Sequence, residues 1–171
     1  MNNSLLSLGS NLGGRKLKIE NCIESLNDSK NIRVVGVSSM YETSPMYNLN
    51  QEDFINCVLE IETPLKALEL LEYTKEIEKK MGRDFQSQRN QPRKIDIDIL
   101  TYNDEIIDEG NLKIPHREIG ERKFVLVPIL ELKGNMFIPG YDKKIEDLIE
   151  DLDRNSDKIR KCNYKINEKN L

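Results

Sequence analysis

The sequence predicts an α+β sandwich in which helices cover one face of a mainly antiparallel sheet. The first observation behind this prediction is that strand-like and helix-like patterns follow one another in the order β-α-β-β-α-β. The second is the length of 171 residues, which suits one domain with a single core. We expect residues 1–171 to form one unit, with the core at about 4–152 and a polar tail at 153–171.

The chain begins with a strand, a helix and a second strand. Leu5 to Leu8 form a short apolar strand that ends at the turn Gly9-Ser10-Asn11. A helix follows from about Arg15 to Asp28, because its apolar residues recur at helical spacing. Residues 32–41 are rich in β-formers and predict the next strand, and a loop with Thr43-Ser44-Pro45 continues to about Asp53.

The next strand and helix are marked by alternation and by capping residues. Residues 54–62 alternate cleanly between two faces, which predicts the third strand. Thr63 as N-cap and Pro64 in the first turn predict a helix that Gly82 ends. From Arg83 to Arg93 the chain has almost no apolar residue, so we expect a mobile lid there.

The fourth strand, at about 95–100, completes the pattern of a ferredoxin-like fold. Residues 125–130 follow as a further buried segment, and 145–152 predict a last helix before the polar tail. Because the helices cover one face, the opposite face is left free for ligands, and Asn56, Asp96 and Asp98 point to it.

Two aspartates stand out in the fourth strand, which reads Pro92-Arg93-Lys94-Ile95-Asp96-Ile97-Asp98-Ile99-Leu100. Alternate side chains on a strand share a face, so the isoleucines point to the core while Asp96 and Asp98 point outward, roughly 6.6 Å apart. Two carboxylates at that spacing suit hard cations that also bind phosphate. The alternative is that both are the solvated face of an edge strand, and the residues alone leave the two readings about even.

Composition excludes several classes of protein. No apolar run approaches the roughly 18 residues that span a bilayer, and the first residues lack the basic start of a signal peptide. Three widely spaced cysteines favour neither a disulfide framework nor a zinc site. A net charge of -4 argues against nonspecific nucleic-acid binding. We therefore expect a soluble, cytoplasmic protein. Composition says nothing about oligomeric state, and a monomer is the working expectation.

Other side chains are candidate ligand-binding residues because of their positions in the sequence. The segment from Lys79 to Lys94 is strongly basic and leads directly into the aspartate pair. Phe54 and Asn56 share a strand face and suit a flat heterocycle, although ordinary packing explains them as well. His116, the only histidine, is by itself more often structural than catalytic.

Together these features resemble a known family. The Gly-Ser-Asn turn, the Thr43-Ser44-Pro45 loop, Phe54 with Asn56, the segment Pro92 to Leu100, Ile-Pro-His116 and Arg122-Lys-Phe124 recur in the order found in 6-hydroxymethyl-7,8-dihydropterin pyrophosphokinases. The resemblance covers about residues 4–152. It implies a ferredoxin-like fold and transfer of the diphosphate of ATP to the hydroxymethyl group of the reduced pterin, with release of AMP, in folate biosynthesis.

The resemblance also implies roles for individual residues. Asp96 and Asp98 would bind two Mg²⁺ ions, and Arg83 and Arg93 would clamp phosphate oxygens, so these four form the catalytic set. The residues expected to bind nucleotide are Leu71, Lys75, Glu78, Arg83, Arg93, Ile99, His116 and Arg122. The residues expected to bind pterin are Thr43, Ser44, Met46, Phe54, Asn56, Asp96 and Phe124.

The chain departs from the family pattern in the expected lid. Asn90-Gln91 stand where Trp-Gly is common, Phe85 stands where a second arginine is common, and Arg117 replaces the aromatic residue that usually follows the histidine. These changes concern lid closure and leave the aspartates and both clamp arginines in place.

Two alternatives to an active enzyme follow. A noncatalytic nucleic-acid-binding module is compatible with a ferredoxin-like sheet, but acids on its open face repel a phosphate backbone. The altered lid also leaves open a family member that has lost activity.

Overall fold

The computed structural model describes residues 1–45, 50–83, 92–152 and 158–164. Its helices are α1 (Arg15–Asn27), α2 (Ala67–Lys80), α3 (Lys123–Lys133) and α4 (Ile145–Leu152), with a 3-10 turn at Ile119–Glu121. Its strands are β1 (Asn2–Ser10), β2 (Arg33–Val37), β3 (Tyr41–Thr43), β4 (Phe54–Thr63), β5 (Asp96–Tyr102), β6 (Ile107–Glu109), β7 (Leu112–Ile114) and β8 (Ile159–Lys161). The predicted first helix and third strand are confirmed to within one residue.

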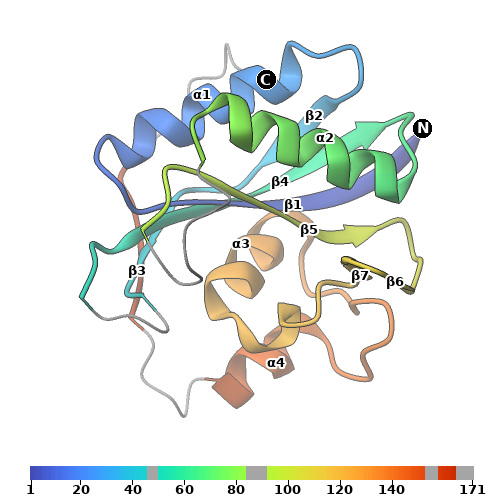
Figure 1. Ribbon diagram of the computed structural model, residues 1–171. Coiled ribbons are helices and arrows are strands. Elements are labelled where there is room, and N and C mark those ends of the chain that lie inside the picture. Colours follow the sequence, from blue (N-terminus) through green and yellow to red (C-terminus); the bar gives the residue numbers. More distant parts are fainter. Residues whose placement is uncertain (46–49, 84–91, 153–157, 165–171) are drawn as a thin grey trace.

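The main sheet places β1 and β4 at its centre. Its strand order is β5-β1-β4-β3-β8, and β2 also pairs with β4 (Figure 1). All pairings among the described strands are antiparallel, which confirms the α+β prediction. β6 and β7 form a separate hairpin. Because β5 lies at one edge of the sheet, half of its backbone groups face away from β1.

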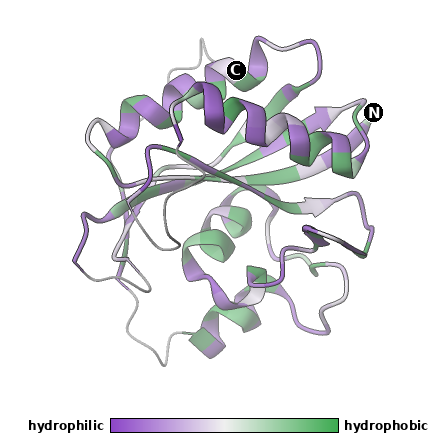
Figure 2. Cartoon of the chain, in the orientation of Figure 1, coloured by the Kyte–Doolittle hydropathy of each residue, from purple (hydrophilic) through white to green (hydrophobic). Residues whose placement is uncertain are grey.

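Helices α1 and α2 cover the first face of the sheet. Leu6, Leu8 and Ile97 are fully buried on this face, together with residues of both helices. Figure 2 shows hydrophilic and hydrophobic residues alternating along α1 and α2, as expected for helices with one buried side. The core that the sequence predicts for these elements is therefore confirmed.

The second face of the sheet is covered as well, which corrects the prediction that helices lie on one face only. Leu5, Val58 and Leu100 point to this face and form a second core with α3 and α4. Figure 2 shows α3 as largely hydrophobic, as expected for a helix that packs on several sides. The reason is that, beyond Asn56, Asp96 and Asp98, this face also carries the apolar side chains of Leu5, Val58 and Leu100, which require cover.

The predicted strand at 32–41 is two strands in the structure. Between β2 and β3, the Ser38 side chain accepts a hydrogen bond from the N–H of Val58 at 2.9 Å, while the Ser38 N–H donates to the Val58 carbonyl at 2.9 Å. The hydroxyl thus replaces one backbone partner and lets the chain change direction. β3 then pairs with the part of β4 that contains Phe54 and Asn56.

Two further boundaries differ from the predictions. Thr63 is not the N-cap of α2 but the last residue of β4, and its hydroxyl accepts a hydrogen bond from the N–H of Leu65 at 3.1 Å. The segment that was expected to be a loose tail contains β8, which pairs with β3, and the N–H of Cys162 donates to the carbonyl of Met40 at 2.8 Å. No helix in the described ranges has the length and apolar character needed to cross a membrane.

Truncation of the second core tests this arrangement. Ile129 on α3 is fully buried, so Ile129→Ala should lower the free energy of unfolding by about 2–5 kcal/mol. Leu68→Ala on α2 is the control, because Leu68 is 46% exposed, and we expect a change within about 0.5 kcal/mol. Urea unfolding measures both. A change in Ile129→Ala as small as in the control would contradict the packing of α3 on the sheet.

Candidate active site

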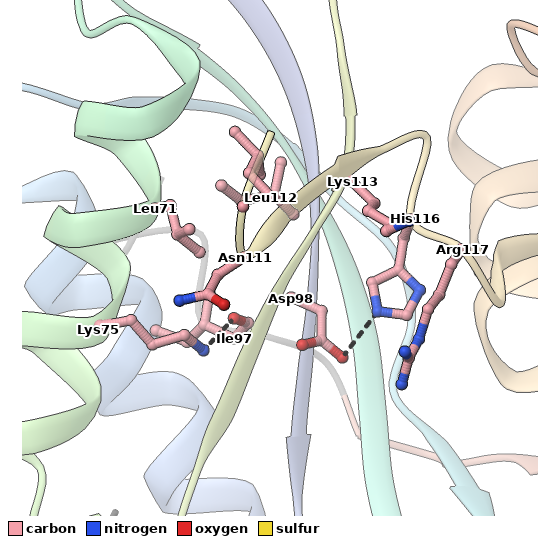
Figure 3. Close-up of a pocket in the computed structure, with 11 residues that line it drawn as sticks. Leu71, Lys75, Ile97, Asp98, Asn111, Leu112, Lys113, His116 and Arg117 are labelled. Carbon is pink, nitrogen blue, oxygen red and sulfur yellow. Dashed lines mark hydrogen bonds and ion pairs between the residues drawn. The ribbon is translucent and has the colours of Figure 1, made fainter. Parts of the chain in front are cut away.

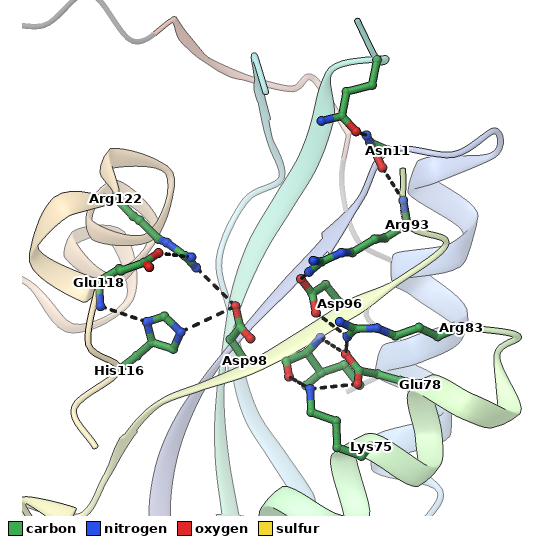
Figure 4. A network of polar contacts seen from close by, with 12 residues as sticks. Asn11, Lys75, Glu78, Arg83, Arg93, Asp96, Asp98, His116, Glu118 and Arg122 are labelled. Carbon is green, nitrogen blue, oxygen red and sulfur yellow. Dashed lines mark hydrogen bonds and ion pairs between the residues drawn. The ribbon is translucent and has the colours of Figure 1, made fainter. Parts of the chain in front are cut away.

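The polar part of the second sheet face brings the two aspartates together with Asn56. Asp96 and Asp98 lie on β5, and Leu100, two residues further, points into the core of α3 and α4. Across the sheet, Gly9 of β1 lies between Asp96 on one side and Asn56 on the other. The structure thus places the predicted metal pair beside the predicted pterin residue, as Figure 4 shows for the aspartates.

Asp96 is held between two arginines. Arg83, which follows α2, and Arg93, which precedes β5, are both ion-paired with its carboxylate (Figure 4). Burial acts to raise the pKa of Asp96, but the charges of Arg83 and Arg93 outweigh it and hold that pKa below its ordinary value. Asp96 is therefore ionised at neutral pH, as a metal ligand must be.

Glu78 on α2 contacts both Arg83 and the backbone of β5. Its side chain is fully buried, is ion-paired with Arg83, and has Oε2 at 2.9 Å from Nζ of Lys75. Its Oε1 accepts a hydrogen bond from the outward N–H of Ile97 at 2.7 Å, so it satisfies the open edge of β5 between the two aspartates. Burial raises its pKa to about 7 against the charges of Lys75 and Arg83. Its predicted contact with nucleotide stays a prediction.

Asp98 lies among groups from the segment between β7 and α3. Its Oδ2 is 3.3 Å from Nη1 of Arg122 and 4.0 Å from Nε2 of His116. His116 is fixed by a hydrogen bond from the N–H of Glu118 to its Nδ1 at 3.2 Å. Burial lowers the pKa of His116 below its ordinary value, although Asp98 opposes that shift, so the imidazole is neutral at neutral pH.

A pocket of about 340 Å³ opens beside Asp98. Four of the predicted nucleotide residues line it, namely Leu71, Lys75, Ile99 and His116 (Figure 3). Asn111, in the turn between β6 and β7, and Lys113, in β7, also line it, and neither belongs to a motif that the sequence alone would single out. Arg117, noted only as a departure from the family pattern, lines the pocket too. Arg83, Arg93 and Arg122 lie at the aspartates rather than among these lining residues.

The predicted pterin residues form a second surface. Asn56 donates a hydrogen bond from Nδ2 to Oγ1 of Thr43 at 2.8 Å, which fixes the orientation of its amide. A Cβ atom at Gly9 would lie 2.9 Å from Oδ1 of Asn56 and 3.8 Å from the ring of Phe54, so a side chain at this position would displace the Asn56 amide. Gly9 was read from the sequence only as part of a turn.

The predicted pterin site also includes Phe124, Ser44 and Met46. Phe124 opens α3, and the guanidinium of Arg122 lies 5.7 Å from the centre of its ring. Ser44 is exposed directly after β3. Met46 and the lid residues Phe85, Asn90 and Gln91 lie outside the described residues.

Asn11 fixes the entry into β5 and was not predicted to do so. Its Oδ1 accepts a hydrogen bond from the N–H of Arg93 at 2.7 Å, and its own N–H donates to the Arg93 carbonyl at 3.1 Å. Its Nδ2 donates to Oε1 of Gln51 at 2.9 Å. The turn after β1 thereby positions Arg93 next to Asp96.

The donor set fits Mg²⁺ bound together with phosphates. In the part of the chain that the structure describes, no group of three or more His, Cys, Asp or Glu residues could hold a metal ion. Mg²⁺ in phosphate-handling sites is commonly bound by one or two carboxylates, and its other positions are filled by water and phosphate oxygens. Asp96 and Asp98 meet that requirement.

Comparisons with known proteins agree with this site. Residues 5–134 match the family model described as 7,8-dihydro-6-hydroxymethylpterin-pyrophosphokinase. The chain is 41% identical over 133 residues to the 2-amino-4-hydroxy-6-hydroxymethyldihydropteridine pyrophosphokinase of Bacillus subtilis, a match that covers 77% of this chain and 79% of that protein. The Haemophilus influenzae protein of the same name is 35% identical over 134 residues, covering 78% of this chain and 83% of that protein.

Longer relatives match over part of their length. The bifunctional protein FolKE of Lactococcus lactis is 41% identical over 137 residues, which are 80% of this chain but 39% of that protein. The folic acid synthesis protein FOL1 of Dictyostelium discoideum is matched over only 20% of its length. The crystal structure of Plasmodium falciparum HPPK-DHPS with pterin and p-hydroxybenzoate has a TM-score of 0.69 at 17% identity, covering 88% of this chain and 41% of that one, and it supports the fold.

The family model spans most of the chain, and two relatives of similar length exceed 30% identity. On these grounds the chain belongs to the 7,8-dihydro-6-hydroxymethylpterin-pyrophosphokinase family.

Proposed function

We propose that the protein transfers the diphosphate of ATP to the hydroxymethyl group of 6-hydroxymethyl-7,8-dihydropterin, releases AMP, and so serves folate biosynthesis. The observation that carries the proposal is the position of the aspartate pair. Asp98 lines the pocket, while Asp96 is separated from Asn56 only by Gly9. A carboxylate pair between a nucleotide pocket and a pterin surface suits transfer from one ligand to the other.

The pocket beside Asp98 is the proposed ATP site. Leu71 and Ile99 supply apolar walls for the base, and Lys75 and His116 supply hydrogen-bond donors. The N–H of Ile97 points away from the sheet and donates to Glu78. Every second residue of an edge strand directs its backbone N–H and C=O away from the sheet, so those of Ile99 point the same way. There they can hydrogen-bond to the edge of the base. Arg122 reaches the phosphates from the far side of Asp98.

The pterin site lies over β1 and β4. Asn56, oriented by Thr43, would bind the amide edge of the ring, and the missing side chain of Gly9 lets the flat ring approach the sheet. Phe54 and Phe124 would stack on the two faces of the ring. The backbone of Ser44 and Met46 would complete the site.

Arg83 and Arg93 are the proposed phosphate clamps. Both guanidiniums now neutralise Asp96, and we propose that they turn to phosphate oxygens when ATP binds, which frees the carboxylate. Asp96 and Asp98 would hold two Mg²⁺ ions, which neutralise developing charge and increase the acidity of the attacking hydroxyl. Glu78 remains as a second partner for Arg83, so that guanidinium is held near the site throughout.

Three finer assignments are part of the proposal. The order β5-β1-β4 with β2 beside β4 supports a ferredoxin-like description of the first half. A monomer is supported by the scatter of exposed apolar side chains over separate elements, such as Leu17, Val35 and Leu68. A cytoplasmic location fits the use of ATP as a substrate. Sedimentation velocity tests the monomer.

The nucleotide product tests the reaction. With ATP, Mg²⁺ and the reduced pterin alcohol, the protein should form AMP and the pterin diphosphate in equal amounts, which chromatography separates and quantifies. Accumulation of ADP would show an ordinary kinase instead. Absence of either product would show a family member without activity.

Neutralising either aspartate tests the metal role. Asp96→Asn and Asp98→Asn should each lower kcat by at least about 10³-fold, because amides bind Mg²⁺ weakly and the phosphate charge is no longer offset. Asp104→Asn is the matched control, since Asp104 is exposed in the turn after β5. Circular dichroism checks that each variant is folded. A rate like that of the unmodified protein in either site variant would refute the role.

A methyl group at Gly9 tests the pterin surface. Gly9→Ala should raise KM for the pterin by about tenfold, because the new Cβ lies 2.9 Å from Oδ1 of Asn56 and displaces the amide. KM for ATP should stay unchanged. Gly36→Ala is the control, since its Cβ would meet neighbours only at 3.5 Å, an ordinary contact distance. Equal pterin KM values for Gly9→Ala and the control would place the pterin elsewhere.

A further inference from the structure

We propose that Glu118 is a positioning residue for the nucleotide phosphates, because its carboxylate holds Arg122 beside Asp98 and its backbone N–H fixes the ring of His116 at the same aspartate. The inference rests on the proposed function, which assigns Asp98 to Mg²⁺ and the adjacent pocket to ATP. Glu118 lies just before the 3-10 turn, outside every set of site residues predicted from the sequence.

The carboxylate of Glu118 binds two cationic side chains. Its Oε2 is ion-paired with Nη2 of Arg122, whose Nη1 lies at 3.3 Å from Oδ2 of Asp98. Its Oε1 lies at 3.4 Å from Nε of Arg117, which lines the pocket. Arg122 is therefore shared between two acids. Because Arg122 also offsets the charge of Glu118, it offsets less of the negative charge of Asp98 than it would if Asp98 were its sole partner.

The backbone of Glu118 sets the chemistry of His116. Because its N–H donates to Nδ1 at 3.2 Å, the proton of the neutral ring lies on Nε2, which faces Oδ2 of Asp98 at 4.0 Å. The N–H of His116 donates to the carbonyl of Leu100 at 2.8 Å, so the segment is tied to β5. His116 is thus held as a hydrogen-bond donor directed to where phosphate oxygens would meet Asp98.

Burial makes these contacts stronger than ordinary surface pairs. The side chains of Glu118 and Arg122 are 22% and 17% exposed. Burial acts to raise the pKa of Glu118, but Arg122 outweighs it and holds that pKa below its ordinary value, so the carboxylate is charged at neutral pH.

The other side of the site contains the same arrangement. Glu78 is ion-paired with Arg83, and Arg83 with Asp96 (Figure 4). Glu118, Arg122 and Asp98 repeat this series of glutamate, arginine and aspartate. In both series the glutamate gives the arginine a partner other than the aspartate, so the arginine stays near the site when the aspartate takes up a cation.

The test removes the charge and keeps the backbone N–H. Glu118→Gln should weaken binding of α,β-methylene-ATP with Mg²⁺ by about tenfold in isothermal titration calorimetry, because a charge-assisted hydrogen bond that orients Arg122 is lost. In turnover, KM for ATP should rise by a similar factor while KM for the pterin stays the same. Glu118→Asp keeps the charge and should bind within about threefold of the unmodified protein.

Glu121→Gln is the matched control, because it makes the same charge change at an exposed position three residues away. Thermal unfolding checks each variant, and Glu118→Ala replaces Glu118→Gln if the latter is unstable. Unchanged analogue affinity in the Glu118 variant, an equal loss in the control, or an equal rise in both KM values would overturn the inference. If the unmodified protein binds the analogue but forms no AMP, the proposed function fails instead, and the binding comparison still decides the role of Glu118.

Discussion

The structure depends on the neutralisation of acidic groups gathered at one end of a sheet face. Asp96, Asp98 and the buried Glu78 lie on or beside the same strand, and such a cluster is tolerated only when cations lie among them. Arg83, Arg93, Lys75 and Arg122 supply these cations. We propose that the same groups exchange their carboxylate partners for phosphate oxygens when ATP binds, so that the interactions that stabilise the ligand-free fold would also prepare the site.

The sheet positions these groups because its second face is divided in two. Toward one end, Leu5, Val58 and Leu100 require α3 and α4 as cover. Toward the other end, Gly9, Asn56 and Asp96 stand in register on neighbouring strands and lie beyond that core. One set of alternating side chains therefore supplies both a packing surface and the candidate active site, and the segment between β7 and α3 brings His116 and Arg122 to the boundary.

Much of the fold and of the site could be predicted from local patterns. Alternation in β4 and β5, helical spacing in α1 and the Asp96–Asp98 pair are properties of neighbouring residues, so they are visible without coordinates. The cover over the second face was missed because residues 123–133 are apolar on nearly all sides and carry no periodic signal. β8 was missed because its pairing partner β3 lies more than a hundred residues away in the chain.

The sequence by itself determined which chemistry is present: two carboxylates on one strand face, arginines on either side of them in the chain, and an aromatic residue and an amide on another strand. Only the tertiary structure decided the partners of these groups, because ion pairs such as Arg122 with Asp98, and the strand register that puts Gly9 between Asp96 and Asn56, join residues distant in the chain. Their geometry comes from the pairing of the whole sheet and its packing against helices on both faces, which no local pattern encodes.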